Sequence, residues 1–523
     1  MRRIVTGFVV VFLAFGRAGW GQADGQDRQG RTTDRRASAA RLRDAHEVRE
    51  RLGLVPEYED FAGIEAVKIA VLDYGFDGIG GGRPYLPPDA EVVEHYDPDF
   101  VRRFGLGDPE FRKSFEPLNR HGRVMAQIVW AVTGSHPSGP KLFLLNANGP
   151  TMLRRAVRFA IERHVDVILF SGSFEGGGNG DGGGPINRIV DDALAADILW
   201  INAAGNYGDR VYNGPVRVLE DGYLRLRDRP DVAALRFRNR LDENTVTVTL
   251  AWNDYRGEED AGTDKDLDLD VEDWAGRRVG SSEKVQVSGS GPLGPDESRN
   301  PRERVVLTDL AADPDLPADP DYSYRIRVRA KKGRFTARDR VRILVTSSRD
   351  AFLLPGDSAP TEAVEFLDAT GEGEIYPPAD HASVLTVGDA DPSSSVGPTA
   401  DGRIKPDVLL SDSRAFFTDG QASAGSSNAA AYLAGVVAVL KAAEPSLRAS
   451  HLLLLARRGA TAPLPQVLPR RDNPPQSTGR GSPFDPPLSS TLATRPLRTS
   501  PPALRVWETP SRARLAEVLR GGR

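Results

Sequence analysis

The sequence predicts an α/β fold, in which helices flank a parallel sheet and an all-β sandwich or jelly roll is inserted. Strand and helix patterns alternate between residues 66 and 206, which is typical of a parallel sheet covered on both faces. Residues 207–348 instead carry short alternating runs between turn signals, with no convincing helix, which indicates a β sandwich. Strand and helix patterns return at residues 382–390 and beyond. The β region therefore interrupts the α/β region.

Hydrophobic spacing places the individual elements. The predicted elements are a short helix at 40–54, strands at 66–77, 165–173, 199–206 and 382–390, helices at 120–132 and 186–198, and a helix opening at Ser426 and Ser427. The last helix has no charged residue from Ala429 to Leu440. We therefore expect it to be buried on all sides.

Length and composition limit the class of protein. The chain of 523 residues, 39% hydrophobic and 27% charged, has room for two or three soluble domains. Its formal net charge of −5 argues against a nucleic-acid partner. It contains no Cys, which excludes disulfides, thiolate metal sites and lipid-modified Cys.

The N-terminal residues predict export. Two arginines precede an apolar run from Ile4 to Phe15 that is too short to span a bilayer, and Ala23 offers a cleavage site. We predict a signal peptide, with a membrane anchor as the alternative. Because a secreted chain without Cys fits a bacterium best, we expect a secreted, periplasmic or cell-envelope protein with no integral membrane segment after signal removal.

These patterns divide the chain into six predicted segments. They are a signal peptide at 1–23, a polar N-terminal segment with a short helix at 24–60, the first part of the α/β domain at 61–206, the inserted β domain at 207–348, the second part of the α/β domain at 349–460, and a Pro-rich, disordered tail at 461–523.

Candidate catalytic side chains stand at the ends of predicted elements. Asp73 follows a buried strand, His121 begins a helix and Ser427 begins the buried helix. Together these three types can activate a hydroxyl, because the imidazole accepts its proton and the carboxylate orients the imidazole. Asn206 ends a third strand and can donate its amide to an oxyanion. Each residue alone also fits a structural role, such as a turn or a helix cap.

Five segments in chain order resemble the subtilisin-like serine proteases, or subtilases. They are "VLDYGFD" around Asp73, "HGRVMA" at His121, "AAGN" ending at Asn206, "GPTADGRIKPDV" at 397–408 and "GSSNAAAYLAG" around Ser427. The order Asp, His, Asn, Ser also agrees with that family. The resemblance covers roughly residues 66–206 and 380–460.

The resemblance implies a serine endopeptidase that acts on protein or peptide substrates without a cofactor for its chemistry. Ser427 would be the nucleophile, His121 the general base and then acid, and Asp73 the group that orients the imidazole. Asn206 and the Ser427 N–H would form the oxyanion hole. The resemblance also implies two walls of a specificity pocket, where an extended peptide could pair as a strand. The wall residues are Ser171, Gly172, Ser173, Ala203, Ala204 and Gly205.

Departures from the family pattern keep an alternative open. Tyr74 and Arg123 stand where the family has small hydroxyl residues, and Ala431 stands where it has Pro. The alternative is a catalytically inactive subtilisin-like scaffold that binds peptides or other surfaces. A secreted esterase is a weaker alternative, because the chain has no Gly-x-Ser-x-Gly elbow.

Two further stretches carry predictions. The stretch "EGGGNGDGGG" at 175–184 lacks the Lys and Ser or Thr of a phosphate loop, and we expect a flexible pocket rim or a linker. Asp266, Asp268 and Asp270 alternate with apolar residues on one strand, which predicts a solvated acidic face or, alternatively, a structural Ca²⁺ site. The surrounding β region resembles the β sandwiches attached to some subtilases.

Overall fold

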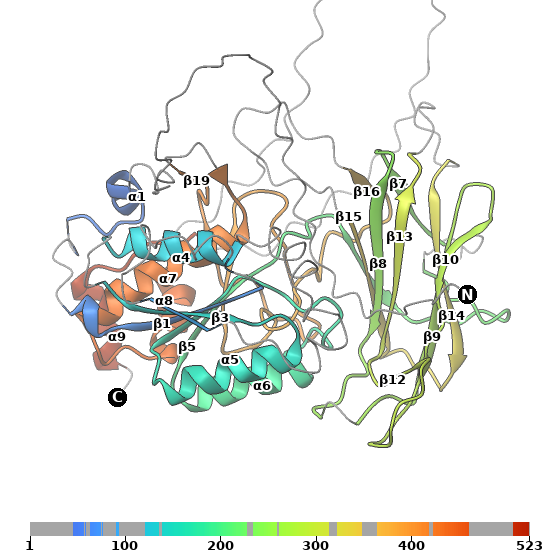
Figure 1. The fold of residues 1–523 in the computed structure, drawn as a ribbon, viewed down its shortest axis with the longest axis horizontal. Helices are drawn as coiled ribbons and strands as arrows, with labels where there is room; N and C mark the ends of the chain where they lie inside the picture. Colours follow the sequence, from blue (N-terminus) through green and yellow to red (C-terminus); the bar gives the residue numbers. More distant parts are fainter. Residues whose placement is uncertain are drawn as a thin grey trace, which may run out of the picture.

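Figure 1 shows an α/β body beside a β sandwich. The computed structural model describes residues 45–56, 58, 63–74, 76, 90–93, 121–134, 139–226, 234–258, 261–312, 322–347, 363–417, 422–459 and 506–521. The predicted signal peptide lies outside these residues.

The α/β body is built on a parallel sheet in which β1 is an inner strand. Its seven described strands run in the order β18-β17-β5-β4-β1-β3-β2, and every pair is parallel. The strands are β1 Lys68–Asp73, β2 Glu91–Val93, β3 Lys141–Asn146, β4 Val167–Phe170, β5 Leu199–Ala203, β17 Leu385–Asp389 and β18 Val408–Leu410. Because the pairs are parallel, the carboxyl ends of β1, β4 and β5 meet at one edge.

Helices cover both faces of this sheet (Figure 1). One core joins α4 (His121–Val132) and α7 (Ser426–Ala443) to one side of the strands, and a second joins α5 (Pro150–Glu162) and α6 (Pro185–Ala195) to the other. The remaining described helices are α1 Ala45–Arg51, η1 Ile64–Ala66, α8 Ala449–Gly459 and α9 Arg512–Gly521. The predicted fold class is therefore confirmed.

The helix α7 is the centre of the first core. Every residue from Ala429 to Leu440 is buried, as the absence of charge predicts. Among the described residues, α7 is the one helix long and apolar enough to cross a membrane, but 78% of it is buried inside the fold. It is thus explained as a core helix.

The prediction of a disordered tail is wrong for its described end. Residues 506–521 return to the α/β body, where Val506 pairs with Leu409 and Trp507 is buried. Leu515 and Val518 of α9 join the core of α7, and α9 contacts α8. Proline-rich composition masked the helical spacing of these apolar residues. The remainder of the predicted tail lies outside the described residues.

The sandwich lies in the sequence between β5 and β17. A sheet of order β10-β9-β14-β7-β16 faces one of order β13-β8-β15-β6, and the two enclose a separate apolar core. The strands are β6 Val211–Pro215, β7 Leu235–Asn239, β8 Asn244–Trp252, β9 Asp266–Glu272, β10 Arg278–Ser282, β13 Arg302–Leu310, β14 Tyr324–Lys332, β15 Arg340–Ser347 and β16 Val364–Phe366. The described residues also form two short strand pairs, β11 Val285–Gln286 with β12 Glu297–Ser298 and β19 Ala415–Phe416 with β20 Ala422–Ser423.

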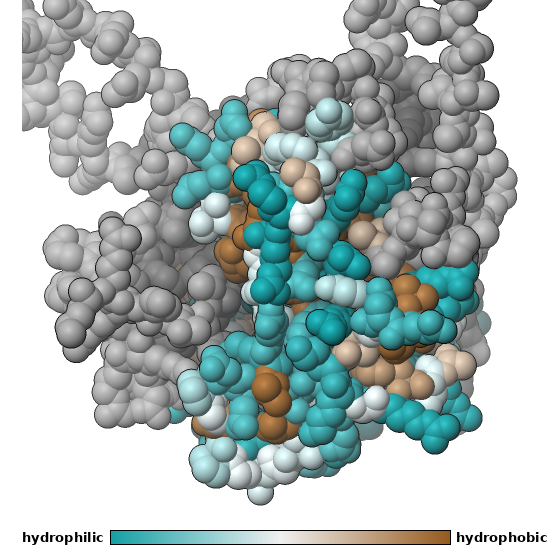
Figure 2. Space-filling model, turned by 90° about the vertical axis from the view of Figure 1, so that its right-hand side faces the viewer, coloured by the Kyte–Doolittle hydropathy of each residue, from teal (hydrophilic) through white to brown (hydrophobic). Residues whose placement is uncertain are grey.

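The acidic strand β9 departs from the solvated face that we predicted. Its three aspartates do share one face, but each is buried, with 6–8% exposure. Asp268 forms an ion pair with Lys331 of β14 at 3.0 Å, and Asp270 with Arg278 of β10 at 2.8 Å. Long basic side chains from the two neighbouring strands therefore cover the carboxylates. Figure 2, which looks onto this side of the molecule, shows a mostly hydrophilic surface.

Candidate active site

Asp73 and His121 meet at the carboxyl edge of the parallel sheet. Asp73 is the last residue of β1 and is 1% exposed, and His121 is the first residue of α4. The Asp73 Oδ2 and His121 Nδ1 atoms are 2.8 Å apart. The Tyr74 N–H donates to the other carboxylate oxygen at 2.8 Å. The carboxylate is thereby fixed on both sides and orients the imidazole.

The two serines at the start of α7 have different surroundings. Ser426 is fully buried, and its hydroxyl donates to Asn206 Oδ1 at 2.9 Å and accepts from the Gly205 N–H at 3.1 Å. Ser427 is partly exposed. Neither serine is the N-cap, which is Gly425 without a side-chain cap. Of the two hydroxyls, only that of Ser427 is open to a substrate.

The Ser427 hydroxyl is bonded away from the histidine. It donates to the Ser171 carbonyl at 3.2 Å, and the Ser171 hydroxyl donates to the Ser427 carbonyl at 3.3 Å. Among the described contacts, no hydrogen bond joins Ser427 to His121. The structure thus brings Asp73 and His121 together directly, and it places Ser427 on the adjoining helix end with a different partner.

Asn206 follows β5 with its side-chain amide in a defined orientation. Its Oδ1 accepts from the Ser426 N–H at 3.0 Å as well as from the Ser426 hydroxyl. Its Nδ2 donates to no acceptor within the described part of the chain and is available as a donor. Gly425 has φ 113°, and a Cβ there would lie 3.1 Å from the Asn206 amide. The turn into α7 therefore needs glycine both for its backbone conformation and for space.

A buried polar network behind Ser427 was missed by sequence reasoning. Asn428 donates to the Ser413 carbonyl at 3.0 Å and to the Ser423 hydroxyl at 2.9 Å. The Ser413 hydroxyl accepts from the Gly425 N–H at 2.9 Å and donates to Asp389 at 2.5 Å. Burial raises the pKa of Asp389. An Asn directly after Ser427, where a buried helix would normally have an apolar residue, was the signal in the sequence.

The two predicted pocket walls lie beside the serine, but one is occupied. The N–H of Ser173 donates to the Tyr74 hydroxyl at 3.2 Å, and that hydroxyl donates to the Ser173 carbonyl at 3.0 Å. The Gly172 carbonyl accepts from Asn202 at 3.1 Å. In an antiparallel pair one residue offers both its N–H and its C=O to the neighbouring strand. A peptide can therefore pair at Ser173 only after the Tyr74 hydroxyl has left.

The second wall carries a buried tyrosine. Ala203, Ala204 and Gly205 lead into Asn206, and Ala204 is fixed by a hydrogen bond from its N–H to the Val387 carbonyl at 2.8 Å. The Tyr207 hydroxyl donates to Glu175 at 2.7 Å and reaches the Ser173 hydroxyl at 3.5 Å. Burial, and then the Glu175 charge, raise the pKa of Tyr207. Tyr207 thus links the two walls.

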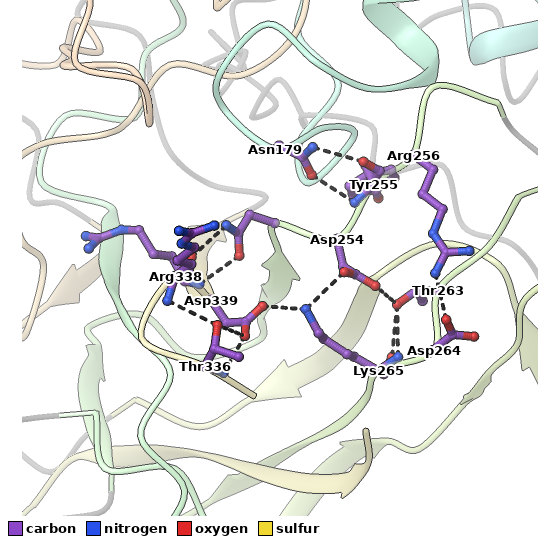
Figure 3. Close-up of polar contacts among 12 residues, drawn as sticks. Asn179, Asp254, Tyr255, Arg256, Thr263, Asp264, Lys265, Thr336, Arg338 and Asp339 are labelled. Atoms are coloured by element: carbon purple, nitrogen blue, oxygen red, sulfur yellow. Dashed lines mark hydrogen bonds and ion pairs between the residues drawn. The ribbon is translucent and has the colours of Figure 1, made fainter. Parts of the chain in front are cut away.

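The Gly-rich stretch after the first wall is held by the sandwich. Arg304 of β13 lies 3.6 Å from the Glu175 carboxylate, and Arg342 of β15 donates to the Gly178 carbonyl at 2.9 Å. Asn179 and Tyr255 exchange two hydrogen bonds of 2.9 and 2.8 Å (Figure 3). Arg304 is itself half-buried, and this desolvation lowers its pKa to about 10. In contrast to the predicted flexible rim or linker, this stretch is held in contact with the sandwich.

The aspartates of β9 do not fit a Ca²⁺ site. Two of the three carboxylates are neutralised by Lys331 and Arg278, and a cation would have to displace them. In the part of the chain that the structure describes, no group of three or more His, Cys, Asp or Glu side chains is placed to hold a metal ion.

Comparison with known proteins connects this site to a family. Residues 330–469, which include Ser427 and α7, match the model of the subtilase family. No curated protein matches the sequence. Among solved structures, the chain is similar to the Clostridium perfringens CspB protease, with 15% identity, coverage of 76% of this chain and 87% of that chain, and a TM-score of 0.43. It is also similar to the prenylagaramide maturation protease PagA, with 10% identity, coverage of 79% of this chain and 86% of that chain, and a TM-score of 0.32. A third is MycP1 without its N-terminal propeptide, with 14% identity over 78% and 86% and a TM-score of 0.31. All three are distant.

Proposed function

We propose that this chain, whose residues 330–469 match the subtilase family, is a secreted serine endopeptidase that uses Asp73, His121 and Ser427. The observation that carries the proposal is the contact of 2.8 Å between Asp73 and His121 at the sheet edge where the partly exposed Ser427 lies in the first turn of α7. A fixed carboxylate, an imidazole and a serine on adjoining elements are the parts of a nucleophilic triad.

The proposed reaction begins when a peptide carbonyl reaches Ser427. The Ser427 hydroxyl turns from the Ser171 carbonyl towards His121, gives up its proton to the imidazole and attacks the carbonyl carbon. Asp73 stabilises the imidazolium that forms. His121 then donates the proton to the leaving amine, and water releases the acyl group by the same route in reverse.

Asn206 supports the charge that develops in this reaction. With its Oδ1 held by Ser426, its Nδ2 can donate to the oxyanion together with the Ser427 N–H. The start of α7 adds the positive end of a helix dipole. The chemistry then requires no cofactor, and the substrate is a protein or peptide.

A labelling experiment tests the proposal. The exported protein and its Ser427→Ala variant are treated with a fluorophosphonate probe and assayed for casein digestion. We expect labelling and digestion by the unaltered protein alone. Cleavage of esters but not of peptide bonds would indicate an esterase.

The inactive scaffold is the second candidate, and two contacts favour it. Ser427 is bonded to Ser171, and Tyr74 occupies both backbone groups of Ser173. An inactive scaffold would bind peptide without being labelled by the probe.

Export is tested separately by determining the N-terminus of the protein recovered outside the cytoplasm, which we expect to follow Ala23.

A further inference from the structure

We infer that Tyr207 restricts the residue on the acyl side of the scissile bond to a small side chain, such as Gly, Ala or Ser. This inference rests on the proposed function, because it concerns the substrate of the same site. It identifies a residue that determines specificity and that the sequence patterns did not reveal.

The position of the acyl-side residue follows from the groups that surround the reacting carbonyl. Its carbon must approach the Ser427 hydroxyl, which lies 3.2 Å from the Ser171 carbonyl, and its oxygen must face Asn206 Nδ2. Ser426 joins Asn206 to Gly205. The attached side chain must therefore enter between the segments 171–173 and 203–205.

Tyr207 spans this space. A Cβ built on Gly205 would lie 2.8 Å from the Tyr207 ring, so the ring contacts one wall. The hydroxyl at the far end of the ring reaches the Ser173 side chain of the other wall at 3.5 Å. The residue is 3% exposed. A large substrate side chain would need the volume that this ring fills.

The ring is held in this position from several sides. Its hydroxyl donates to Glu175, its own N–H donates to the Ser395 hydroxyl at 3.0 Å, and Tyr376 packs edge-on with ring centroids 5.5 Å apart. Arg304 of the sandwich lies against the same Glu175 carboxylate. Displacing Tyr207 would leave the half-buried Glu175 carboxylate with one partner fewer, which costs free energy.

Glu175 does not convert the pocket into a site for basic side chains. Its carboxylate already interacts with the Tyr207 hydroxyl and with Arg304, and Arg302 donates to its backbone carbonyl at 3.4 Å. A Lys or Arg of a substrate would meet two arginines beside this carboxylate. We therefore expect small neutral residues to be preferred over both large apolar and basic ones.

The test is a series of peptides that differ only in the acyl-side residue, which is Ala, Ser, Leu, Phe or Lys. Their kcat/KM is measured with the unaltered protein, Tyr207→Ala and Tyr207→Phe. We expect the unaltered protein to prefer Ala to Phe by at least about tenfold, since the fit of a few methylene groups is worth that much. Tyr207→Ala should reduce or reverse the ratio, whereas Tyr207→Phe, which keeps the ring, should retain it.

Fluorophosphonate labelling of the same samples separates the two ideas. A labelled protein that prefers Phe, Leu or Lys overturns the inference about Tyr207 alone, as does an unchanged ratio in a folded, labelled Tyr207→Ala variant. An unaltered protein that is never labelled overturns the proposed function together with this inference. If Tyr207→Ala does not fold, the preference for Ala over Phe peptides in the unaltered protein and in Tyr207→Phe still tests the inference.

Discussion

Tyr74 stands next to Asp73, yet its hydroxyl reaches across to the segment that a peptide substrate would contact. It accepts from the Ser173 N–H at 3.2 Å and donates to the Ser173 carbonyl at 3.0 Å. Burial, followed by the charges of Glu175 and Asp73, raises the pKa of Tyr74, so the hydroxyl remains neutral at any working pH. In the proposed reaction, an extended peptide would therefore compete with an internal side chain for both groups.

Replacing Tyr74 by Phe should remove this competition. Each neutral hydrogen bond contributes about 1 kcal/mol net, so two bonds that no longer have to be broken are worth up to about 2 kcal/mol. That difference corresponds to an upper limit of roughly 30-fold in affinity. We expect the KM for a hexapeptide that extends along Ser173 to fall towards this limit, with kcat little changed.

The assay compares that hexapeptide with a small ester that contacts only the acyl-side pocket, whose KM should not change. Tyr432→Phe is the matched control, because it also removes a buried hydroxyl that donates to a backbone carbonyl, at 3.0 Å, but from the core of α7. If Tyr74→Phe left the hexapeptide KM unchanged, or lowered both KM values equally, the proposed competition at Ser173 would be refuted.

Three other predictions concern Ser426, Glu303 and Trp507. Ser426→Ala should lower kcat about tenfold, because it removes a hydrogen bond that orients Asn206, and this loss should be smaller than the loss of the oxyanion donor itself. Ser426→Thr should retain activity, and equal kcat values for the two variants would contradict the orienting role of Ser426. Burial raises the pKa of Glu303 from 4.5 to about 7, so the folded state holds this proton more tightly than the unfolded state does, and the free energy of unfolding should fall by up to about 3 kcal/mol as pH rises through that interval. In thermal unfolding, the stability of Glu303→Gln should depend less on pH than that of the unaltered protein, and an identical pH dependence would disprove the assignment. Trp507→Ala should cost about 3 kcal/mol in unfolding free energy measured with urea, whereas a change near zero would mean that residues 506–521 do not dock.

The sequence was most informative where a candidate site residue adjoins a regular element. Asp73 ends an apolar strand, Asn206 follows one and Ser427 lies at the start of an apolar helix, and the parallel sheet brings such ends to one edge. The apolar residues Leu515 and Val518 were also readable as one helix face, but the proline-rich residues before them dominated the interpretation.

Long-range contacts were not predictable in this way. β9 has the alternation that we expected, yet its carboxylates are covered because β10 and β14 supply Arg278 and Lys331. Nothing in the local pattern of β9 indicates which strands become its neighbours. The same holds for Tyr74, whose partner Ser173 lies in the segment that follows β4.

One chain of contacts in the described structure leads from the sandwich to the candidate site. Arg304 contacts Glu175, Glu175 accepts from Tyr207, and Tyr207 lies between the two pocket walls. Because Arg304 and Glu175 are both largely shielded from water, removing either charge takes an ion-pair partner from the other. Side chains of β13 and β15 also hold the Gly-rich stretch at 175–184, which therefore is not a free loop. A sandwich inserted in the sequence between Asn206 and Ser427 is thus positioned to fix the shape of the proposed pocket.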